Sequence, residues 1–269
     1  MGEAVVCKSN SLIQAGYKLT INEQRIILSC IALLDSREQV TDESLYRVSV
    51  GDIADALGVD RRNMYKDIKS ATARLMDRKV KLSHDPSGRP FKDKMMVTRW
   101  IQSVFYQDTS ATVSLRFSKD ILPYLTQLTT QFTKYGLYNI YRMKSMYSVR
   151  MYELAAQYRK VGQREIELEW LRDVLHIDPG AYGRPNDLKR YVIEPAMRDI
   201  NDVSDMWVKS EYKKTGRKTT HLLLTFGDKK KKSKRPTPVS TPTIQRKTKP
   251  RLVDELVDQH IAKFNTKSH

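Results

Sequence analysis

The sequence predicts an α+β fold in which one order of elements, helices followed by a β-hairpin, occurs twice before a basic tail. A helical hairpin and strand-like runs lie between residues 22 and 117, the same order returns between 137 and 226, and lysine and proline become frequent from residue 229. Two helices joined by a tight turn and followed by a β-ribbon form a winged helix. We therefore predict two tandem winged-helix domains, residues 1–132 and 133–228, and a disordered basic tail, residues 229–269.

The first domain begins with an apolar helix over residues 22–34 and a short strand over 46–50. Ser49 is suited to cap the next helix, which Gly58 then ends. Asp60 is suited to cap the helix that follows. On that helix apolar residues recur at spacings of three and four, so they form one buried stripe of Met64, Ile68, Ala71 and Leu75.

The charged residues of this second helix lie off the buried stripe. In helix-turn-helix proteins the second helix enters the major groove of DNA. The candidate DNA contacts are Arg61, Arg62, Asn63, Lys66 and Lys69. A solvated basic face is the alternative interpretation. Strand-like runs follow at residues 79–83, 95–106 and 112–117, and a polar turn lies at 84–94.

The second domain repeats this architecture without close sequence identity. The predicted elements are helices over 137–159, 166–177 and 186–201 and strands over 206–212 and 220–226. The first helix carries a stripe that we assign to the core, made of Ile140, Met143, Tyr147, Met151, Leu154 and Tyr158. Pro195 lies inside the third helix and removes the hydrogen bond to the Tyr191 carbonyl, so we expect a bend there.

The last two strands form a hairpin whose inward face is apolar and whose tip is basic. Alternation directs Leu222, Leu224 and Phe226 to the core, opposite Val208, Ser210 and Tyr212, and Thr215-Gly216 is expected to form the turn. Clustered cations repel one another unless an anion relieves the repulsion. We therefore predict phosphate contacts from Lys213, Lys214, Arg217, Lys218, Thr219, Thr220 and His221. A solvated hairpin tip is the alternative.

The overall charge supports a polyanionic partner. The chain has 48 Lys and Arg against 31 Asp and Glu, a formal net charge of +17. Nucleic acid is the first candidate partner and an anionic membrane surface the second. No apolar run reaches the roughly 18 residues of a membrane span, and we expect no membrane partner. The two cysteines show neither a disulfide framework nor zinc spacing, which favours a reducing cytoplasm.

Enzymatic chemistry finds no support in the sequence. There is no G-x-x-x-x-G-K-[ST] loop for ATP hydrolysis, no H-x-H pair for a nicking enzyme and no acidic cluster for a two-metal nuclease. We therefore predict no catalytic, metal-binding or cofactor-binding residues and no cofactor.

These segments, taken in order, resemble the initiator replication proteins of iteron-bearing theta-replicating plasmids, the group of the F-plasmid initiator. The resemblance runs from Ser9 to Phe226. It is carried by SNSLIQAGYKLTINEQRIIL, MYKDIKSATARL, LRFSKDILPYLTQL, QYRK, YGRPNDLKRYVIEPAMRDIN and GRKTTHLLLTF. Each segment alone is a weak signal, whereas the ordered set is specific.

The resemblance implies two winged-helix domains related by a pseudo-twofold axis. Family members bind direct repeats, or iterons, at the plasmid origin as monomers, open the origin, and repress their own gene as dimers on an inverted repeat. The host initiator, the replicative helicase and chaperones are the implied protein partners. The second domain is the main reader, and by position its base contacts come from Arg184, Asn186, Lys189 and Arg190. Whether Lys189, which replaces an arginine, reads a base or a phosphate stays open.

Three features of the sequence allow more than one interpretation. By resemblance the strands over 95–117 carry the dimer interface, where Trp100, Ile101, Val104 and Phe105 either form that interface or fill the core. The tail from Asp228 onward has a net charge of +8 and a possible helix at 251–264. We interpret this tail as an arm that holds DNA without sequence specificity, and a solubilising or degradation-related segment is the alternative. A transcriptional repressor with no replication role is the rival function, and it would bind an inverted repeat alone.

Overall fold

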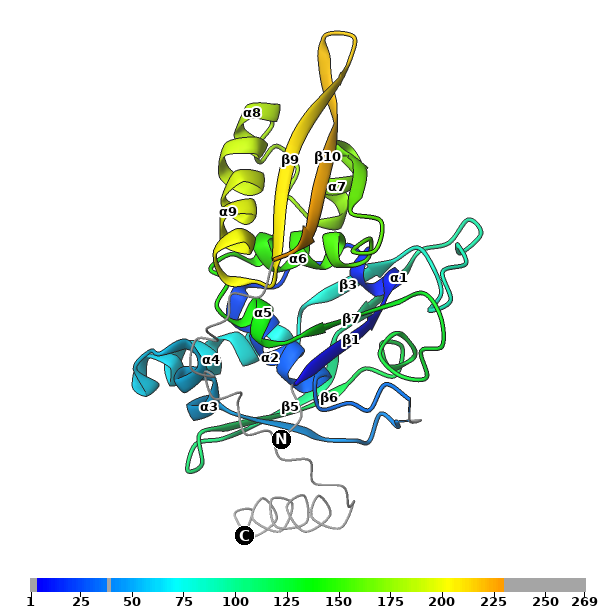
Figure 1. Ribbon diagram of the computed structural model, residues 1–269. Coiled ribbons are helices and arrows are strands. Elements are labelled where there is room, and N and C mark those ends of the chain that lie inside the picture. Colours follow the sequence, from blue (N-terminus) through cyan, green and yellow to red (C-terminus); the bar gives the residue numbers. More distant parts are fainter. Residues whose placement is uncertain (1–3, 38–39, 230–269) are drawn as a thin grey trace, which may run out of the picture.

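The computed structural model of the protein describes residues 4–37 and 40–229 (Figure 1). Both expected winged-helix units are present, each with the order helix, strand, helix, helix and hairpin. The first contains α2 (Ile21–Ile31), β2 (Tyr46–Ser49), α3 (Val50–Leu57), α4 (Arg61–Leu75), β5 (Ile101–Gln107) and β6 (Thr112–Phe117). The second contains α6 (Met146–Ala156), β8 (Gln163–Glu167), α7 (Leu168–Val174), the long helix described below, β9 (Met206–Thr215) and β10 (Lys218–Asp228).

The two sheets share one topology. In the first the strand order is β2-β6-β5, and in the second it is β8-β10-β9, with antiparallel pairing throughout. The last strand of each unit therefore lies between the other two. This shared order confirms that one architecture occurs twice.

Local capping signals produce the helical hairpin of the first domain as predicted. The Ser49 side chain accepts a hydrogen bond from the Asp52 amide, and Gly58 ends α3 with φ 67°. The Asp60 side chain accepts from the amides of Arg62 and Asn63 at the start of α4. The apolar stripe of α4 is buried as expected. These side chains satisfy amides that a helix start would otherwise leave without a partner.

The prediction of one continuous helix over 137–159 is wrong. The segment consists of α5 (Tyr138–Tyr141) and α6, separated at residues 142–145. Arg25 of α2 donates to the carbonyls of Tyr141 and Met143, and the Ser145 side chain caps α6. Tertiary hydrogen bonds thus replace those that a continuous helix would make. Tyr158 lies beyond the end of α6 and is exposed, not part of the core.

The predicted helix over 166–177 begins later, because residues 163–167 form strand β8 along β10. The predicted strand over 95–106 is divided at the buried Trp100 into β4 (Met96–Arg99), which pairs with β3 (Lys79–Leu82), and β5. Elements that the sequence did not predict are β1 (Val5–Ser9), α1 (Asn10–Ile13), η1 (Leu122–Tyr124) and β7 (Phe132–Gly136). Strand β7 pairs with β1. It includes residue 132, where we predicted the boundary between the two domains, and that boundary stays a prediction.

A buried ionic cluster joins strand β1 to helix α6. Lys8 of β1 donates to Glu153 of α6 at 2.8 Å and to the Tyr17 hydroxyl at 3.0 Å. Burial favours a raised pKa for Glu153, but Lys8 and Arg150 outweigh it and hold that pKa below its usual value. Arg150 also donates to the carbonyls of Ala15 and Val174. Since a buried charge without its partner is costly, this junction resists separation.

Candidate nucleic-acid interface

The predicted reading helix of the second domain contains three consecutive segments. These are α8 (Pro185–Leu188), a π-helical turn η2 (Lys189–Ile193) and α9 (Glu194–Val203). The amide of Glu194 donates to the carbonyl of Lys189, five residues back. The wide turn lies directly before Pro195, whose missing amide and bulky ring disfavour a regular α-helical turn. Buried residues recur every four positions at Leu188, Val192, Ala196 and Ile200, Ile193 and Met197 beside them are also buried, and α9 packs against α6 and β9.

The start of this helix presents three of the four predicted base contacts to solvent. Arg184, Asn186 and Arg190 are exposed, and neither arginine forms an ion pair within the described part of the chain. Lys189 differs: its ammonium lies 3.7 Å from the Glu194 carboxylate and 5.1 Å from the Tyr212 ring centroid. Lys189 is therefore engaged within the protein, while the other three side chains are available to a ligand.

Beside this helix, hairpin β9–β10 extends beyond the body of the domain (Figure 1). The predicted register is confirmed, since Leu222, Leu224 and Phe226 pair with Tyr212, Ser210 and Val208. The turn itself is Gly216-Arg217, with Lys218 paired to Thr215, so the expected Thr215-Gly216 turn is off by one residue. Gly216 has the expected positive φ of 62°. A β-bulge at Thr220 then shifts the register.

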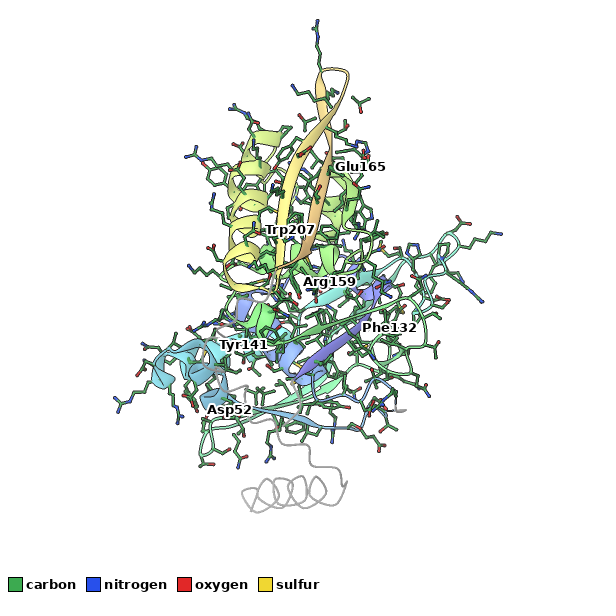
Figure 2. The ribbon with its side chains drawn as sticks, in the orientation of Figure 1. Asp52, Phe132, Tyr141, Arg159, Glu165 and Trp207 are labelled. Carbon is green, nitrogen blue, oxygen red and sulfur yellow. The ribbon has the colours of Figure 1, made fainter. Side chains whose placement is uncertain are left out.

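The predicted phosphate contacts of this hairpin are not equivalent. Lys214, Arg217 and Lys218 are exposed and form no ion pair with any residue in the described ranges. Lys213 lies 2.5 Å from Glu165, which Figure 2 labels beside the hairpin, and its hydrogen bond lowers the pKa of Glu165. Thr219, Thr220 and His221 are half-buried, and Thr220 shares hydrogen bonds with Thr215 and His221. The free charge is therefore concentrated at the tip.

In the first domain, two of the predicted DNA contacts are engaged by carboxylates. Arg61 makes a bidentate pair with Asp55 at 3.0 and 2.6 Å, which lowers the pKa of Asp55. Lys69 lies 3.1 Å from Asp108, at the tip of hairpin β5–β6, and Tyr65 donates to the same oxygen at 2.5 Å. The remaining candidates, Arg62, Asn63 and Lys66, are exposed.

Figure 1 places these surfaces at two ends of the molecule. Helix α4 and hairpin β5–β6 lie at the lower left, whereas α8 and hairpin β9–β10 lie at the top. The structure does not bring the two sets of predicted contacts into one cluster. It presents them as two separate basic surfaces on one body.

Sequence reasoning missed a third basic surface, on hairpin β3–β4 and its loop. Its exposed cations form no ion pair with a described residue: Lys79, Lys81, Arg89, Lys92, Lys94 and Arg99. The alternation of lysines in β3 was the available signal. This hairpin extends to the right in Figure 1, away from α3 and α4, and the second domain has no counterpart among its described residues.

The residues considered for a dimer interface divide into two groups. Trp100 and Ile101 are fully buried and belong to the core. Val104 is half-buried and Phe105 is 43% exposed, both on β5, which is an edge strand of its sheet. Of these four residues, the latter two are available to another chain.

Within residues 4–37 and 40–229, no helix has the length and apolar character needed to cross a membrane. Over the same residues, His, Cys, Asp and Glu side chains do not gather in threes in a way that could hold a metal ion. The predicted tail lies outside the described residues except for Lys229. The ammonium of Lys229 donates to the carbonyls of Asn201 and Ser204 at the end of α9.

Two tandem winged-helix units with exposed basic helices and a basic hairpin define a protein of the DNA-binding winged-helix class. The chain belongs to the initiator replication protein family, the iteron plasmid initiators that the sequence resembles. The profile of the family's first winged-helix domain, "Initiator Replication protein, WH1", matches residues 5–156. That of the second, "Initiator Rep protein, WH2", matches residues 167–226.

Individual relatives agree with this membership. A replication initiation protein of Escherichia coli is 30% identical over 230 residues, which cover 83% of this chain and 69% of the relative. An uncharacterized 27.6 kDa protein of Escherichia coli is 24% identical over 226 residues, 79% of this chain and 91% of that protein. The crystal structure of the Pi initiator protein in complex with iteron DNA superposes with a TM-score of 0.68 at 20% identity, covering 83% and 97% of the two chains. This likeness confirms the fold.

Proposed function

We propose that the protein binds direct repeats at a plasmid origin as a monomer, with each domain placing its helix in one major groove. The observation that carries this proposal is the exposed start of α8, with Arg184, Asn186 and Arg190 available beside a hairpin with a free basic tip. A winged helix contacts base edges with the start of its second helix and phosphates with its hairpin. The similar Pi initiator was solved bound to iteron DNA.

In this proposal the second domain is the main reader of sequence. Its free arginines suit guanine, whose O6 and N7 accept a bidentate hydrogen bond from a guanidinium. The first domain contributes Arg62, Asn63 and Lys66. Lys189 is assigned to phosphate or structural contact, because Glu194 and Tyr212 already engage its ammonium.

Binding at the origin is proposed to open the adjacent duplex and to recruit the host initiator, the helicase and chaperones, all in the bacterial cytoplasm. A dimer is proposed to repress the protein's own gene on an inverted repeat. The exposed edge of β5 supports this dimer, since an edge strand offers unpaired backbone groups to a second chain. The protein itself is proposed to carry out no catalysis and to need no cofactor.

A footprint on the DNA that flanks the protein's own gene, at physiological salt, tests the proposal. We expect a ladder of evenly spaced protections about two helical turns apart, because two domains each occupy one groove. A single symmetric protected site over the promoter would leave a repressor without a replication role. Protection no stronger than on random DNA would refute sequence-specific binding.

A further inference from the structure

The loop before α8 holds a tyrosine in an unusual backbone conformation. Tyr182 has φ 52°, in the left-handed region that residues other than glycine seldom adopt. Arg172 of α7 fixes this conformation, because its guanidinium donates to the carbonyls of both Ala181 and Tyr182. Strained residues that their surroundings hold in place cluster at binding sites. The loop therefore holds the backbone that carries the Tyr182 ring in one conformation.

That ring stacks on a second tyrosine from the reading helix. The ring centroids of Tyr182 and Tyr191 lie 6.1 Å apart, with an angle of 29° between the ring planes. Tyr191 belongs to η2 and is 54% exposed, so the pair lies at the surface rather than in the core. Stacked aromatic rings restrict each other's rotation, which makes the pair a rigid surface element.

Arg190 lies against this pair. Its guanidinium carbon is 5.4 Å from the Tyr191 ring centroid, within the range of a cation–π contact. Arg190 forms no ion pair with another described residue, so the ring is the group that its guanidinium contacts. Arginine has a long, freely rotating side chain, and ordering it before binding reduces the entropy lost on binding.

We propose that Tyr182 and Tyr191 act as positioning residues, forming an aromatic support that holds Arg190 in the orientation in which it reads a guanine. The proposal rests on the proposed function, since it needs Arg190 in a major groove. Tyr191 supplies the ring that contacts Arg190. Tyr182, fixed by Arg172, keeps that ring in place.

The test uses the full chain and a 30-base-pair duplex that it selects from a random pool. Each guanine of the selected site is replaced in turn by 7-deazaguanine, which lacks the N7 acceptor. For the wild type, one replacement should weaken binding, and Arg190→Ala should be insensitive to that replacement. Tyr191→Ala should weaken binding to the unmodified site by about two- to fivefold, the size of an exposed cation–π contact. Tyr191→Ala should also reduce the loss of affinity that 7-deazaguanine causes at that position.

Three further variants make the result specific. Tyr191→Phe keeps the ring and should behave as the wild type. Tyr182→Gly, which tolerates the left-handed φ but removes the stacked ring, should resemble Tyr191→Ala. The double variant Arg190→Ala/Tyr191→Ala should bind no more weakly than Arg190→Ala alone. Unchanged affinity for random DNA and unchanged thermal unfolding show that each variant is folded.

Several outcomes would overturn the proposal. If Tyr191→Phe is as weak as Tyr191→Ala, the hydroxyl makes the contact. If the two single effects add in the double variant, Tyr191 acts independently of Arg190. If Arg190→Ala keeps its sensitivity to 7-deazaguanine, Arg190 does not read that guanine. Failure to enrich any sequence from the random pool is a different result, because it refutes the proposed function itself.

Discussion

Hairpin β5–β6 of the first domain carries Asp108 at its tip, whereas the corresponding hairpin β9–β10 of the second carries Arg217 and Lys218. Asp108 accepts hydrogen bonds from Tyr65 and Lys69 of α4, so the first hairpin braces its own helix. The tip of the second hairpin extends past the start of α8, and its cations form no ion pairs with described residues. The same topology thus carries two different charge arrangements, and the number of free cations, rather than the fold, distinguishes the second domain, which we propose to be the main reader of sequence.

The largest loss of DNA-binding free energy is expected from substitutions in the helices that we propose to enter the major grooves. Arg190→Ala should cost about 1–3 kcal/mol of binding free energy on the selected site and little on random DNA, since alanine cannot hydrogen-bond to a base. Arg62→Ala in the first domain is the matched change and should cost less on the selected site. Binding isotherms on both DNAs measure this difference. Equal losses on specific and random DNA would show that Arg190 contacts phosphate only.

The second hairpin is expected to act through salt-dependent contacts. Replacing Lys214 and Arg217 by glutamine should reduce the slope of log affinity against log salt by about 0.9 for each phosphate that the hairpin no longer neutralises. The control is the same replacement at Lys92 and Lys94, which removes equal charge from the loop between β3 and β4. If both double variants change the slope equally, net charge explains the effect and the second hairpin has no special role.

The smallest change in DNA binding is expected from a substitution that makes the first hairpin more similar to the second. Asp108→Asn removes the charge that engages Lys69, so that lysine becomes available to phosphate. The salt slope on random DNA should steepen by at most about 0.9, the value for one additional neutralised phosphate. Thermal unfolding serves as the control for α4, which loses a brace. A slope that stays constant in a folded variant would mean that Lys69 faces away from the DNA.

Much of this fold could be predicted because its signals are local. Ser49, Gly58 and Asp60 act on amides within a few residues, so α3 and α4 were placed correctly. The break before α6 depends on Arg25, more than a hundred residues away in sequence, and β8 depends on the edge that β10 offers. No local pattern contains that information.

The candidate site was predictable to the same extent. The charge pattern indicated the basic helices and the basic hairpin β9–β10, although the basic hairpin β3–β4 was missed. It did not reveal that Asp55, Asp108 and Glu165 engage Arg61, Lys69 and Lys213, because these carboxylates come from other elements. The π-helical turn was also beyond local reasoning, although Pro195 signalled that the helix would be irregular there.

The buried cluster of Lys8, Arg150 and Glu153 has a consequence for the DNA. Breaking such a pair costs about 3–5 kcal/mol, so β1 and α6 stay joined, and α6 in turn packs against α9 of the second domain. Duplex DNA turns once in about 10.5 base pairs. If each domain occupies one major groove as proposed, two domains held in a fixed arrangement require a fixed helical phase between the two grooves. An origin repeat lengthened by half a turn would present its second groove on the far side, however well its bases matched.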